Sequence, residues 1–371
     1  MEWKEVRLGD VCNIITGFPF PGKKYSKEGI RVVRGDNVTI GNLRWDTEKD
    51  KRWNEPFDKT EYYSLQANDI VIGMDGSRVG KNKARIKEED LPLLLAQRVA
   101  CVRHNELAEQ DYLYYNIFSK KFIDYVNSIH TGSAIPHISQ KQIEDYKILL
   151  PNLETQRRIA SILSSLDRKI ELNNKINADL EEMAQAIFKN WFVDFEPFKD
   201  GKFVDSELGM IPEGWKVGRL DEIADVVGGS TPSKAKPEYY TQKGIAWLTP
   251  KDLSNHPAVY TSRGEIDITE EGYNSTSTKL MPKGTILFTS RAPIGYISIA
   301  QNDICTNQGF KSLVPKKAGT CFLYCFLKYV TPEIENKSTG STFKEASGSL
   351  MKSLQVLMPE QKVFEDFETI V

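Results

Sequence analysis

The sequence predicts an α+β protein built from two tandem, similar domains that are joined by a long helical, coiled-coil-like spacer. Two observations carry this prediction: the chain repeats itself at a nearly constant offset, and one uninterrupted amphipathic stretch follows the first copy. The 371 residues also suffice for two domains that each bury a core. We expect a first domain at 1–151, the spacer at 152–196, a second domain at 197–358, and the start of a second helical region at 359–371.

The repeat is a set of ordered matches between the two halves of the chain. The clearest pairs are Trp3-Lys4 with Trp215-Lys216, Gly29-Ile30 with Gly244-Ile245, Gln97 with Gln308, and Thr131-Gly132-Ser133 with Thr339-Gly340-Ser341. The matches keep their order, and their offset drifts only between 208 and 215. A duplicated unit of about 150 residues explains this better than chance does.

Each copy mixes strand and helix patterns. Short apolar runs bounded by Gly and Pro predict strands at 70–72, 99–102, 285–288 and 311–314. Helical periodicity predicts helices at 112–129 and 322–330. Ser139 and Gln142 have the spacing of a capping box, which predicts a short helix there. An α+β domain with a curved sheet follows from this order.

The spacer shows apolar residues at steps of three and four, with no Gly or Pro between 152 and 191. Asn152 can cap its start, and Pro197 and Gly201 follow its end. Such a helix is about 55–60 Å long, and its stripe favours packing against another helix. A core helix of one domain is the alternative. The residues expected to bind a partner are Ile162, Leu166, Ile170, Ile176, Leu180, Met183, Ile187 and Trp191.

Composition limits the class of protein. The five cysteines include no Cys-x-x-Cys pair, so we expect them to be reduced. The four histidines lack metal-ligand spacing, so we expect no metal. The sequence starts without a signal-peptide pattern and has no apolar run of membrane-spanning length, which predicts a cytoplasmic protein without a membrane partner.

Motifs for catalysis are missing. The sequence has no Gly-x-x-x-x-Gly-Lys-Ser/Thr loop for phosphates and no Asn-Pro-Pro-aromatic or Asp-Pro-Pro-Tyr segment of the kind that holds a flipped base. We therefore expect no catalytic residue and no cofactor on this chain. A self-sufficient methyltransferase or nuclease with degenerate motifs is the alternative, and a scaffold that binds only protein is a third reading.

Basic residues instead indicate nucleic-acid binding. The net charge is −2, but the segment 76–87 has five basic residues and no acidic one. The segment 273–332 has seven basic residues and one acidic residue. Arginine can form two hydrogen bonds with the edge of guanine, and glutamine can form two with the edge of adenine. Gly76-Ser77-Arg78 and Thr289-Ser290-Arg291 occupy nearly equivalent places, each just after a predicted strand. A turn is the ordinary role of each such motif taken alone, but the motifs recur in both copies. The expected DNA-binding residues are Ser77, Arg78, Lys81, Lys83, Gln97, Arg98, Thr131, Gly132, Ser133, Lys251, Thr289, Ser290, Arg291, Gln308, Lys311, Thr339, Gly340 and Ser341.

Several strings together resemble the specificity subunit of type I restriction-modification enzymes. They are Trp3-Lys4 with Leu8-Gly9-Asp10, the segment 191–197 that closes the spacer, 208–215 before the second domain, and Pro151 with Glu154 and Gln156, echoed by Pro359-Glu360-Gln361. The resemblance covers essentially the whole chain. It implies that each domain is a target-recognition domain for one half of a split DNA site.

The resemblance also implies partners. Methyltransferase and restriction subunits would dock on the helical regions and carry the chemistry, with S-adenosylmethionine, ATP and Mg²⁺ bound on those subunits. The family has a second long helical region, which is largely missing before residue 371. We therefore expect the uncovered stripe of the spacer to drive self-association in the absence of partners.

Overall fold

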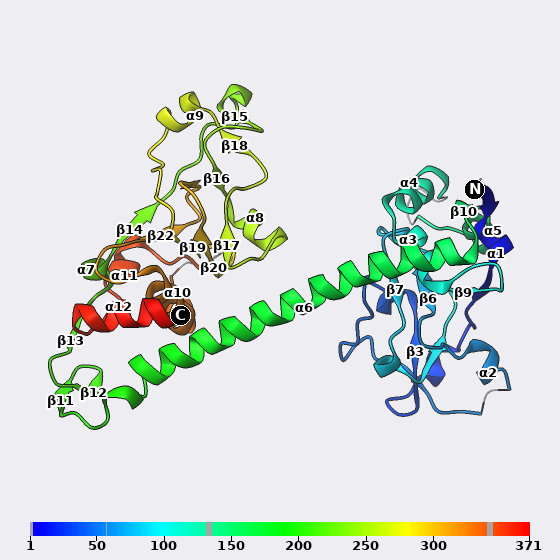
Figure 1. Cartoon of the computed structure of the whole chain (residues 1–371), viewed down its shortest axis with the longest axis horizontal. Coiled ribbons are helices and arrows are strands. Elements are labelled where there is room, and N and C mark those ends of the chain that lie inside the picture. The colour runs from blue at the N-terminus through cyan, green and yellow to red at the C-terminus, as the bar shows by residue number, and fades with distance from the viewer. Residues whose placement is uncertain (1–2, 57, 131–135, 340–343) are drawn as a thin grey trace. The chain divides into compact units, whose positions relative to one another are not determined.

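The computed structural model describes residues 3–56, 58–130, 136–339 and 344–371. The chain divides into two compact units, unit 1 at Met1–Asn174 and unit 2 at Lys175–Val371. A single helix, α6 (Leu153–Phe192), begins in unit 1 and ends in unit 2 (Figure 1). Each unit is an α+β domain, so the predicted fold class is confirmed.

Unit 1 is built around a five-stranded sheet with the order β2-β9-β6-β7-β4. These strands are β2 (Cys12–Thr16), β9 (Val99–His104), β6 (Ile70–Gly73), β7 (Lys83–Arg85) and β4 (Ile40–Gly41). The edge pair β4 and β7 is parallel, and the other pairs are antiparallel. Further strands are β3 (Ile30–Val33), which pairs in parallel with β8 (Leu93–Leu95) and antiparallel with β5 (Arg52–Trp53), and β1 (Lys4–Arg7), which pairs with β10 (Lys147–Leu150).

The helices of unit 1 are short, and one of them differs from the prediction. The expected helix at 112–129 is broken into α3 (Gln110–Ile117) and α4 (Lys120–Ile129). The break occurs because the Ser119 hydroxyl accepts a hydrogen bond from the amide of Phe122 (3.3 Å) and so caps a new helix. The other helical segments are α1 (Leu8–Val11), η1 (Gly22–Lys24), η2 (Gly35–Asn37), α2 (Thr60–Tyr63), η3 (Glu88–Asp90) and α5 (Gln140–Glu144).

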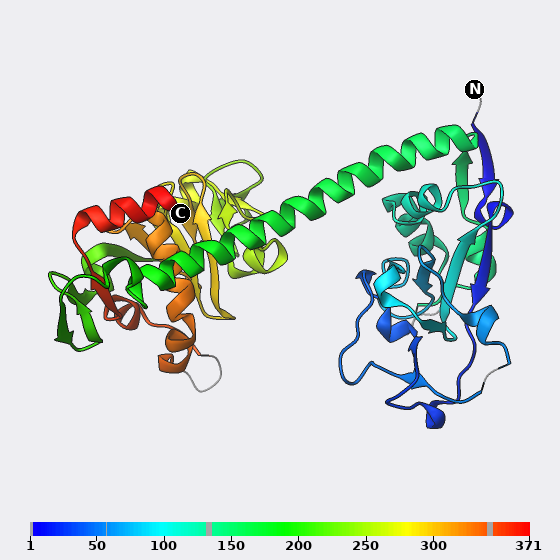
Figure 2. The ribbon, with the colours of Figure 1, turned by 60° about the horizontal axis from the view of Figure 1, so that its bottom comes forward.

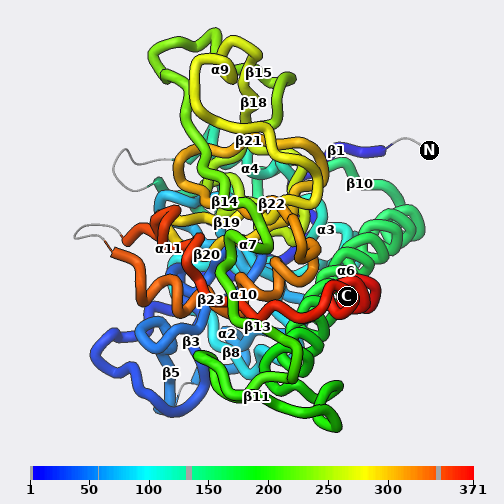
Figure 3. The backbone as a smooth tube through the Cα atoms, turned by 90° about the vertical axis from the view of Figure 1, so that its left-hand side faces the viewer, coloured from blue at the N-terminus to red at the C-terminus, as the bar shows by residue number. Residues whose placement is uncertain are grey.

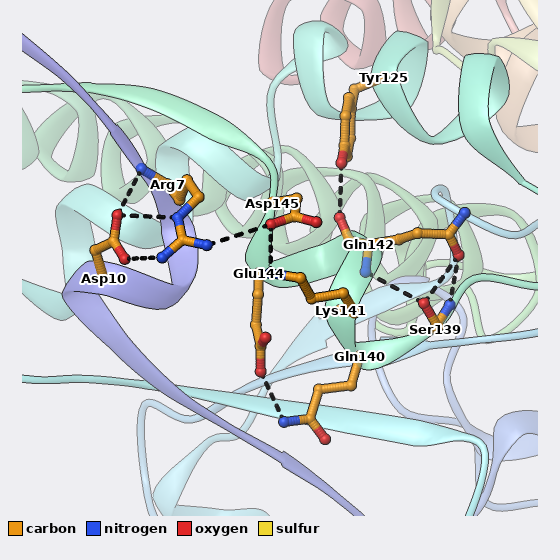
Figure 4. Close-up of polar contacts among 9 residues, drawn as sticks. All are labelled: Arg7, Asp10, Tyr125, Ser139, Gln140, Lys141, Gln142, Glu144 and Asp145. Atoms are coloured by element: carbon orange, nitrogen blue, oxygen red, sulfur yellow. Dashed lines mark hydrogen bonds and ion pairs between the residues drawn. The ribbon is translucent and has the colours of Figure 1, made fainter.

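The predicted capping box at the start of α5 is present. The Gln142 amide donates to the Ser139 hydroxyl at 3.2 Å, and the Ser139 amide donates to the Gln142 side-chain oxygen at 2.8 Å. Figure 4 shows this exchange beside Arg7, which lies between Asp10 and Asp145. The ion pair of Arg7 with Asp145 (3.6 Å) attaches the last residue of β1 to the residue that follows α5.

Unit 2 repeats the same architecture. Its five-stranded sheet has the order β14-β22-β19-β20-β17, again with one parallel edge pair, β17 and β20. These strands are β14 (Ala224–Gly228), β22 (Lys311–Pro315), β19 (Ile286–Ser290), β20 (Ile294–Ala300) and β17 (Tyr260–Thr261). The parallel pair β16 (Trp247–Leu248) and β21 (Cys305–Thr306) matches β3 and β8, and β13 (Lys216–Arg219) with β23 (Gln355–Met358) matches β1 and β10. The duplication expected from the sequence is therefore confirmed in the topology.

The remaining elements of unit 2 surround this sheet. They are η4 (Glu196–Phe198), β11 (Phe203–Ser206), β12 (Gly209–Pro212), α7 (Leu220–Ile223), η5 (Pro237–Tyr239), β15 (Tyr240–Thr241), α8 (Pro250–Asn255), β18 (Asp267–Ile268), α9 (Glu270–Asn274), α10 (Thr320–Lys337), α11 (Gly348–Lys352) and α12 (Gln361–Ile370). Figures 1 and 3 place β15, β18 and α9 at the end of unit 2 away from α12. All five cysteines are free.

The first turns of α6 belong to the core of unit 1. Gln156 is fully buried, and its side-chain nitrogen donates to the carbonyls of Pro151 (2.9 Å) and Leu107 (3.1 Å). Its side-chain oxygen accepts from the amide of Glu109 at 2.9 Å, directly before α3. Gln156 therefore satisfies backbone groups that would otherwise be buried without partners.

The last turns of α6 belong to the core of unit 2. Phe188 and Phe192 are buried, and Phe192 meets Phe367 of α12 with ring centroids 5.2 Å apart. In Figure 2, α12 lies alongside this part of α6. Ile187 and Trp191 are partly buried against this core, so only part of each side chain is open to a partner. The remaining stripe residues are exposed, and they are Ile162, Leu166, Ile170, Ile176, Leu180 and Met183.

Candidate nucleic-acid interface

Backbone hydrogen bonds give the residue-by-residue match between the two units. The Met74 amide donates to the Arg98 carbonyl at 2.9 Å, and the Ser290 amide donates to the Gly309 carbonyl at 2.8 Å. The donor is the residue directly after β6 in unit 1 and the last residue of β19 in unit 2, and in each unit the acceptor lies in the loop before the neighbouring strand, β9 or β22. Met74 is thus equivalent to Ser290, and Arg98 to Gly309.

This match corrects one part of the sequence alignment. Gly76-Ser77-Arg78 was expected to occupy nearly the same place as Thr289-Ser290-Arg291. In the structure Arg291 stands at the position of Asp75, one residue beyond Met74. Arg78 lies further along a β6–β7 connection that is longer than the β19–β20 connection of unit 2. The two arginines are therefore not equivalent.

Unit 1 has a cleft of about 670 Å³ at this place. It brings together four predicted residues from two separate loops: Ser77, Arg78, Gln97 and Arg98, all of which are exposed. It also contains residues that the sequence reasoning missed, among them Tyr25, Arg34, Asp36, Arg44 and Asp75. Arg34 to Asn37 could have been found by extending the Gly29-Ile30 match, because the same offset leads to Thr249 to Asp252.

Charges of both signs line the cleft. The Arg98 guanidinium pairs with the Asp75 carboxylate at 3.0 Å, and that of Arg34 pairs with Asp36 at 2.9 Å. Arg34 also stands over the ring of Tyr25, 5.8 Å from its centroid. The carboxylates hold the guanidinium groups in place, so the cleft presents oriented donors rather than a uniform positive surface.

A close backbone crossing positions Gln97 and Gln308. A Cβ atom on Gly17 would lie 2.1 Å from the carbonyl oxygen of Ala96, and one on Gly229 would lie 2.2 Å from that of Thr306. Only glycine permits this approach at either place. The exposed glutamine then follows the crossing strand in both units, and Gln308 hydrogen-bonds with Thr231.

Two lysines of the β6–β7 connection have different roles. Lys81 is exposed, as expected for a DNA contact. Lys83 is only 3% exposed, so its assignment to the DNA-binding surface is corrected. Its ammonium group donates to the Gly80 carbonyl at 2.9 Å and lies 5.1 Å from the ring centroid of Phe122. Burial lowers the pKa of Lys83 to about 8.

In unit 2 the charged residues gather around Glu345. Its carboxylate pairs with Arg291 at 3.4 Å and with Lys311 at 3.4 Å. Lys311 is largely shielded, and Arg291 is about one-third exposed. Arg291 is therefore the better placed of the two for an outside ligand. Glu345 was not predicted from the sequence, because it is remote from both Arg291 and Lys311 along the chain.

Three other predicted residues of unit 2 fall into two groups. Thr289 and Ser290 are fully buried, and their hydroxyls donate to the carbonyls of Pro293 (2.9 Å) and Gly309 (3.2 Å), so the expected DNA contact is corrected. Lys251 is exposed and lines a separate cleft of about 510 Å³. It is equivalent to Asp36 of unit 1.

The structure describes only one residue of the two Thr-Gly-Ser motifs, Thr339. Thr131, Gly132, Ser133, Gly340 and Ser341 lie outside the described residues. Thr339 is described, and its carbonyl accepts a hydrogen bond from the Glu345 amide at 3.0 Å. That bond places Thr339 beside the cluster around Glu345.

Two searches of the described residues give negative results. In that part of the chain, no three His, Cys, Asp or Glu side chains are arranged to hold a metal ion. None of the helices described is both long and apolar enough for a membrane crossing.

Two units that present different charged side chains on one repeated framework define a two-part recognition protein. A family model described as the type I restriction modification DNA specificity domain matches residues 1–182 and 212–367. The chain belongs to this family. The class expected from the sequence, a specificity subunit rather than an enzyme in its own right, is confirmed, and no comparison supports the self-sufficient enzyme.

Individual relatives agree with the family model. The chain is 42% identical over 173 residues to the type I restriction enzyme MjaIX specificity subunit of Methanocaldococcus jannaschii. These aligned residues cover 46% of this chain and 40% of that protein. It is 24% identical over 433 aligned positions to the HindI specificity subunit of Haemophilus influenzae, which spans 99% and 92%. The crystal structure of the S subunit of a type I restriction-modification system from M. genitalium has the same fold, with a TM-score of 0.58 at 17% identity over 100% of this chain and 90% of that one.

Proposed function

We propose that this chain reads a two-part, asymmetric DNA site and that each unit recognises one half. The observation that carries the proposal is the reversal of charge at matched positions. Asp75 of unit 1 corresponds to Arg291 of unit 2, and Asp36 corresponds to Lys251. A carboxylate accepts hydrogen bonds from cytosine, whereas arginine and lysine donate to guanine. The two units therefore suit unlike sequences.

In this proposal, the chain acts on DNA only through partner subunits. Methyltransferase subunits would modify the site that it selects, and a restriction subunit would translocate and cleave. S-adenosylmethionine, ATP and Mg²⁺ would then be bound on those subunits in the cytoplasm. The names of the relatives support this division, because they describe specificity subunits of restriction enzymes.

A methylation assay tests the proposal. The chain is co-expressed with its methyltransferase subunits, and methylated positions are mapped by sequencing the modified DNA. We expect one motif with two unlike halves separated by a spacer. The purified chain alone should transfer no methyl groups. Turnover by the chain alone, at a rate that follows its concentration, would overturn the proposal.

The exposed stripe of α6 is the proposed docking site for the methyltransferase subunits. Ile176 and Leu180 are both exposed, and large aliphatic side chains contribute about 1.5–3 kcal/mol each when fully buried. An uncovered stripe of this kind favours association. We expect the isolated chain to self-associate through α6 and the methyltransferase subunits to compete for the same face.

Two paired variants test this surface by analytical ultracentrifugation. Ile176→Glu with Leu180→Glu should abolish self-association and leave both units folded. Asn174→Glu with Ala178→Glu adds the same charge on the opposite side of the helix and should leave association unchanged. A wild-type chain that sediments as a monomer at high concentration would contradict the prediction.

A further inference from the structure

We propose that Arg98, held by Asp75, is a specificity-determining residue of unit 1 that donates hydrogen bonds to the edge of one base pair. The inference rests on the proposed function, since it assigns a residue to the reading of one half-site. It is carried by the backbone of Arg98, by its single side-chain partner, and by the charge of the cleft around it.

The backbone of Arg98 adopts a conformation that arginine rarely adopts. Its φ is 66°, in the left-handed region, which places Cβ too close to the carbonyl oxygen for most side chains. The equivalent residue of unit 2 is Gly309, where a Cβ atom would lie 2.7 Å from a side-chain carbon of Pro250. An arginine at this point is therefore a feature of unit 1 alone. Strained residues of this kind persist mainly at functional sites.

The side chain of Arg98 is both exposed and oriented. It is 68% exposed, although its carboxylate partner Asp75 is only 19% exposed. Among the described residues, the 3.0 Å contact with Asp75 is the only ion pair or side-chain hydrogen bond of this guanidinium. A guanidinium group carries five N–H donors, so a two-donor edge stays open for a ligand. Two parallel donors match the O6 and N7 acceptors of guanine.

The carboxylate beside Arg98 favours a base edge over a phosphate as its ligand. The cleft holds Asp36 and Asp75 together with Arg34, Arg44, Arg78 and Arg98, and the carboxylate 3.0 Å from the Arg98 guanidinium is that of Asp75. A phosphate group bound to Arg98 would lie close to this carboxylate and be repelled by it, whereas a base edge is neutral and offers both donors and acceptors. Gln97, next to Arg98, adds an amide that can both donate and accept. The pair therefore has the chemistry of direct readout.

The matched variants are Arg98→Gly and Asn68→Gly. Both remove a non-glycine residue from left-handed backbone in unit 1, since Asn68 has a φ of 72°. Asn68 is exposed but does not line the cleft. Glycine adopts this conformation freely, so neither variant should lower the melting temperature of unit 1 through its backbone. Arg98→Asn serves as a second test, because asparagine also tolerates left-handed backbone.

The measurement is discrimination by the complete complex with its methyltransferase subunits. The probes are duplex DNA with the wild-type motif and duplexes with each single base-pair change. Arg98→Gly and Arg98→Asn should lower discrimination at one base pair of one half-site by about 5- to 150-fold, the equivalent of about 1–3 kcal/mol. The other half-site should be read as before, and Asn68→Gly should change no position.

Three results separate the inference from the function on which it rests. Full discrimination by both Arg98 variants, in a complex that still reads a two-part motif, overturns the inference alone. An equal loss of affinity for unrelated sequences also overturns it, because Arg98 would then contact phosphate. A wild-type complex without any sequence preference overturns the proposed function itself.

Discussion

Just beyond β6 unit 1 carries Asp75, and at the equivalent position of unit 2, just beyond β19, stands Arg291. Around this difference the framework is shared: the order of the five strands, the parallel edge pair and the crossing beside the exposed glutamine are the same in both units. Even the partner is changed, since Asp75 pairs with Arg98 and Arg291 pairs with Glu345.

The comparison teaches which positions the fold itself determines. Gly17 and Gly229 are both glycine because another backbone lies within about 2 Å of their missing Cβ atoms. At the cleft positions the charged partner changes together with the residue, so the shared framework does not dictate which charge stands there. A duplicated recognition domain can therefore change what it binds without changing how it folds.

The largest expected effect is a break in the shared framework. Gly17→Ala or Gly229→Ala should destabilise its own unit by more than about 3 kcal/mol, because the new Cβ must displace backbone. The other unit should keep its unfolding transition. Calorimetry checks this. Gly22→Ala and Gly228→Ala are the controls, since no atom lies within 4 Å of either added Cβ. Loss of both transitions together would show that the units do not fold independently.

A smaller effect should separate the two reading surfaces. Arg291→Ala should weaken recognition of one half-site by about 1–3 kcal/mol, with the half read by unit 1 untouched. Lys311, which shares Glu345 with Arg291, begins β22, and Lys317 lies beyond the other end of that strand. Lys317→Ala therefore removes a positive charge away from Arg291 and should leave the reading of both halves unchanged. Binding to duplexes with one altered half-site gives the answer. Equal weakening on unrelated DNA would make Arg291 a phosphate contact instead.

The smallest effect concerns one buried position. In the paired strands Lys83 stands opposite Ile72, and its counterpart Ile297 stands opposite Phe288. The folded pKa of Lys83 is about 8, below its usual 10.5. Between these values the unfolded chain holds a proton that the folded chain has lost, so the free energy of unfolding should rise with pH.

Replacing Lys83 by the residue of unit 2 isolates this contribution. Between pH 8 and 10 the free energy of unfolding of unit 1 should rise by about 1–2 kcal/mol less in Lys83→Ile than in the wild type. Urea titrations of both proteins at each pH give the difference. Lys81→Ile, at an exposed lysine nearby, should follow the wild type. Parallel curves for Lys83→Ile and the wild type would show that Lys83 is not desolvated.

Local patterns in the sequence predicted most of the framework. The strands at 70–72 and 311–314 and the capping box of Ser139 with Gln142 depend on neighbouring residues only. The repeat was visible because the framework residues match in order. Ser119 could have indicated the break between α3 and α4, since it has the spacing of a helix cap.

The cleft was harder to predict, because it depends on register and on distant residues. Arg78 was matched with Arg291 since the different lengths of the two connections are invisible in a short string. Lys83 was taken as a surface base, but helix α4 brings Phe122 over it. Ser290 was taken as a DNA contact beyond the predicted strand 285–288, although the strand β19 continues through it.

Gln156 has a consequence for the order of events during protein synthesis. Its buried amide binds the carbonyls of Leu107 and Pro151, so unit 1 lacks part of its interior until the first turn of α6 exists. β3 and β8, which pair in parallel, are also far apart in sequence, since Arg31 pairs with Leu93, and their contact therefore forms slowly. A nascent chain that has left the ribosome only as far as residue 151 is therefore incomplete, and the first reading surface matures together with the beginning of the helix that follows it.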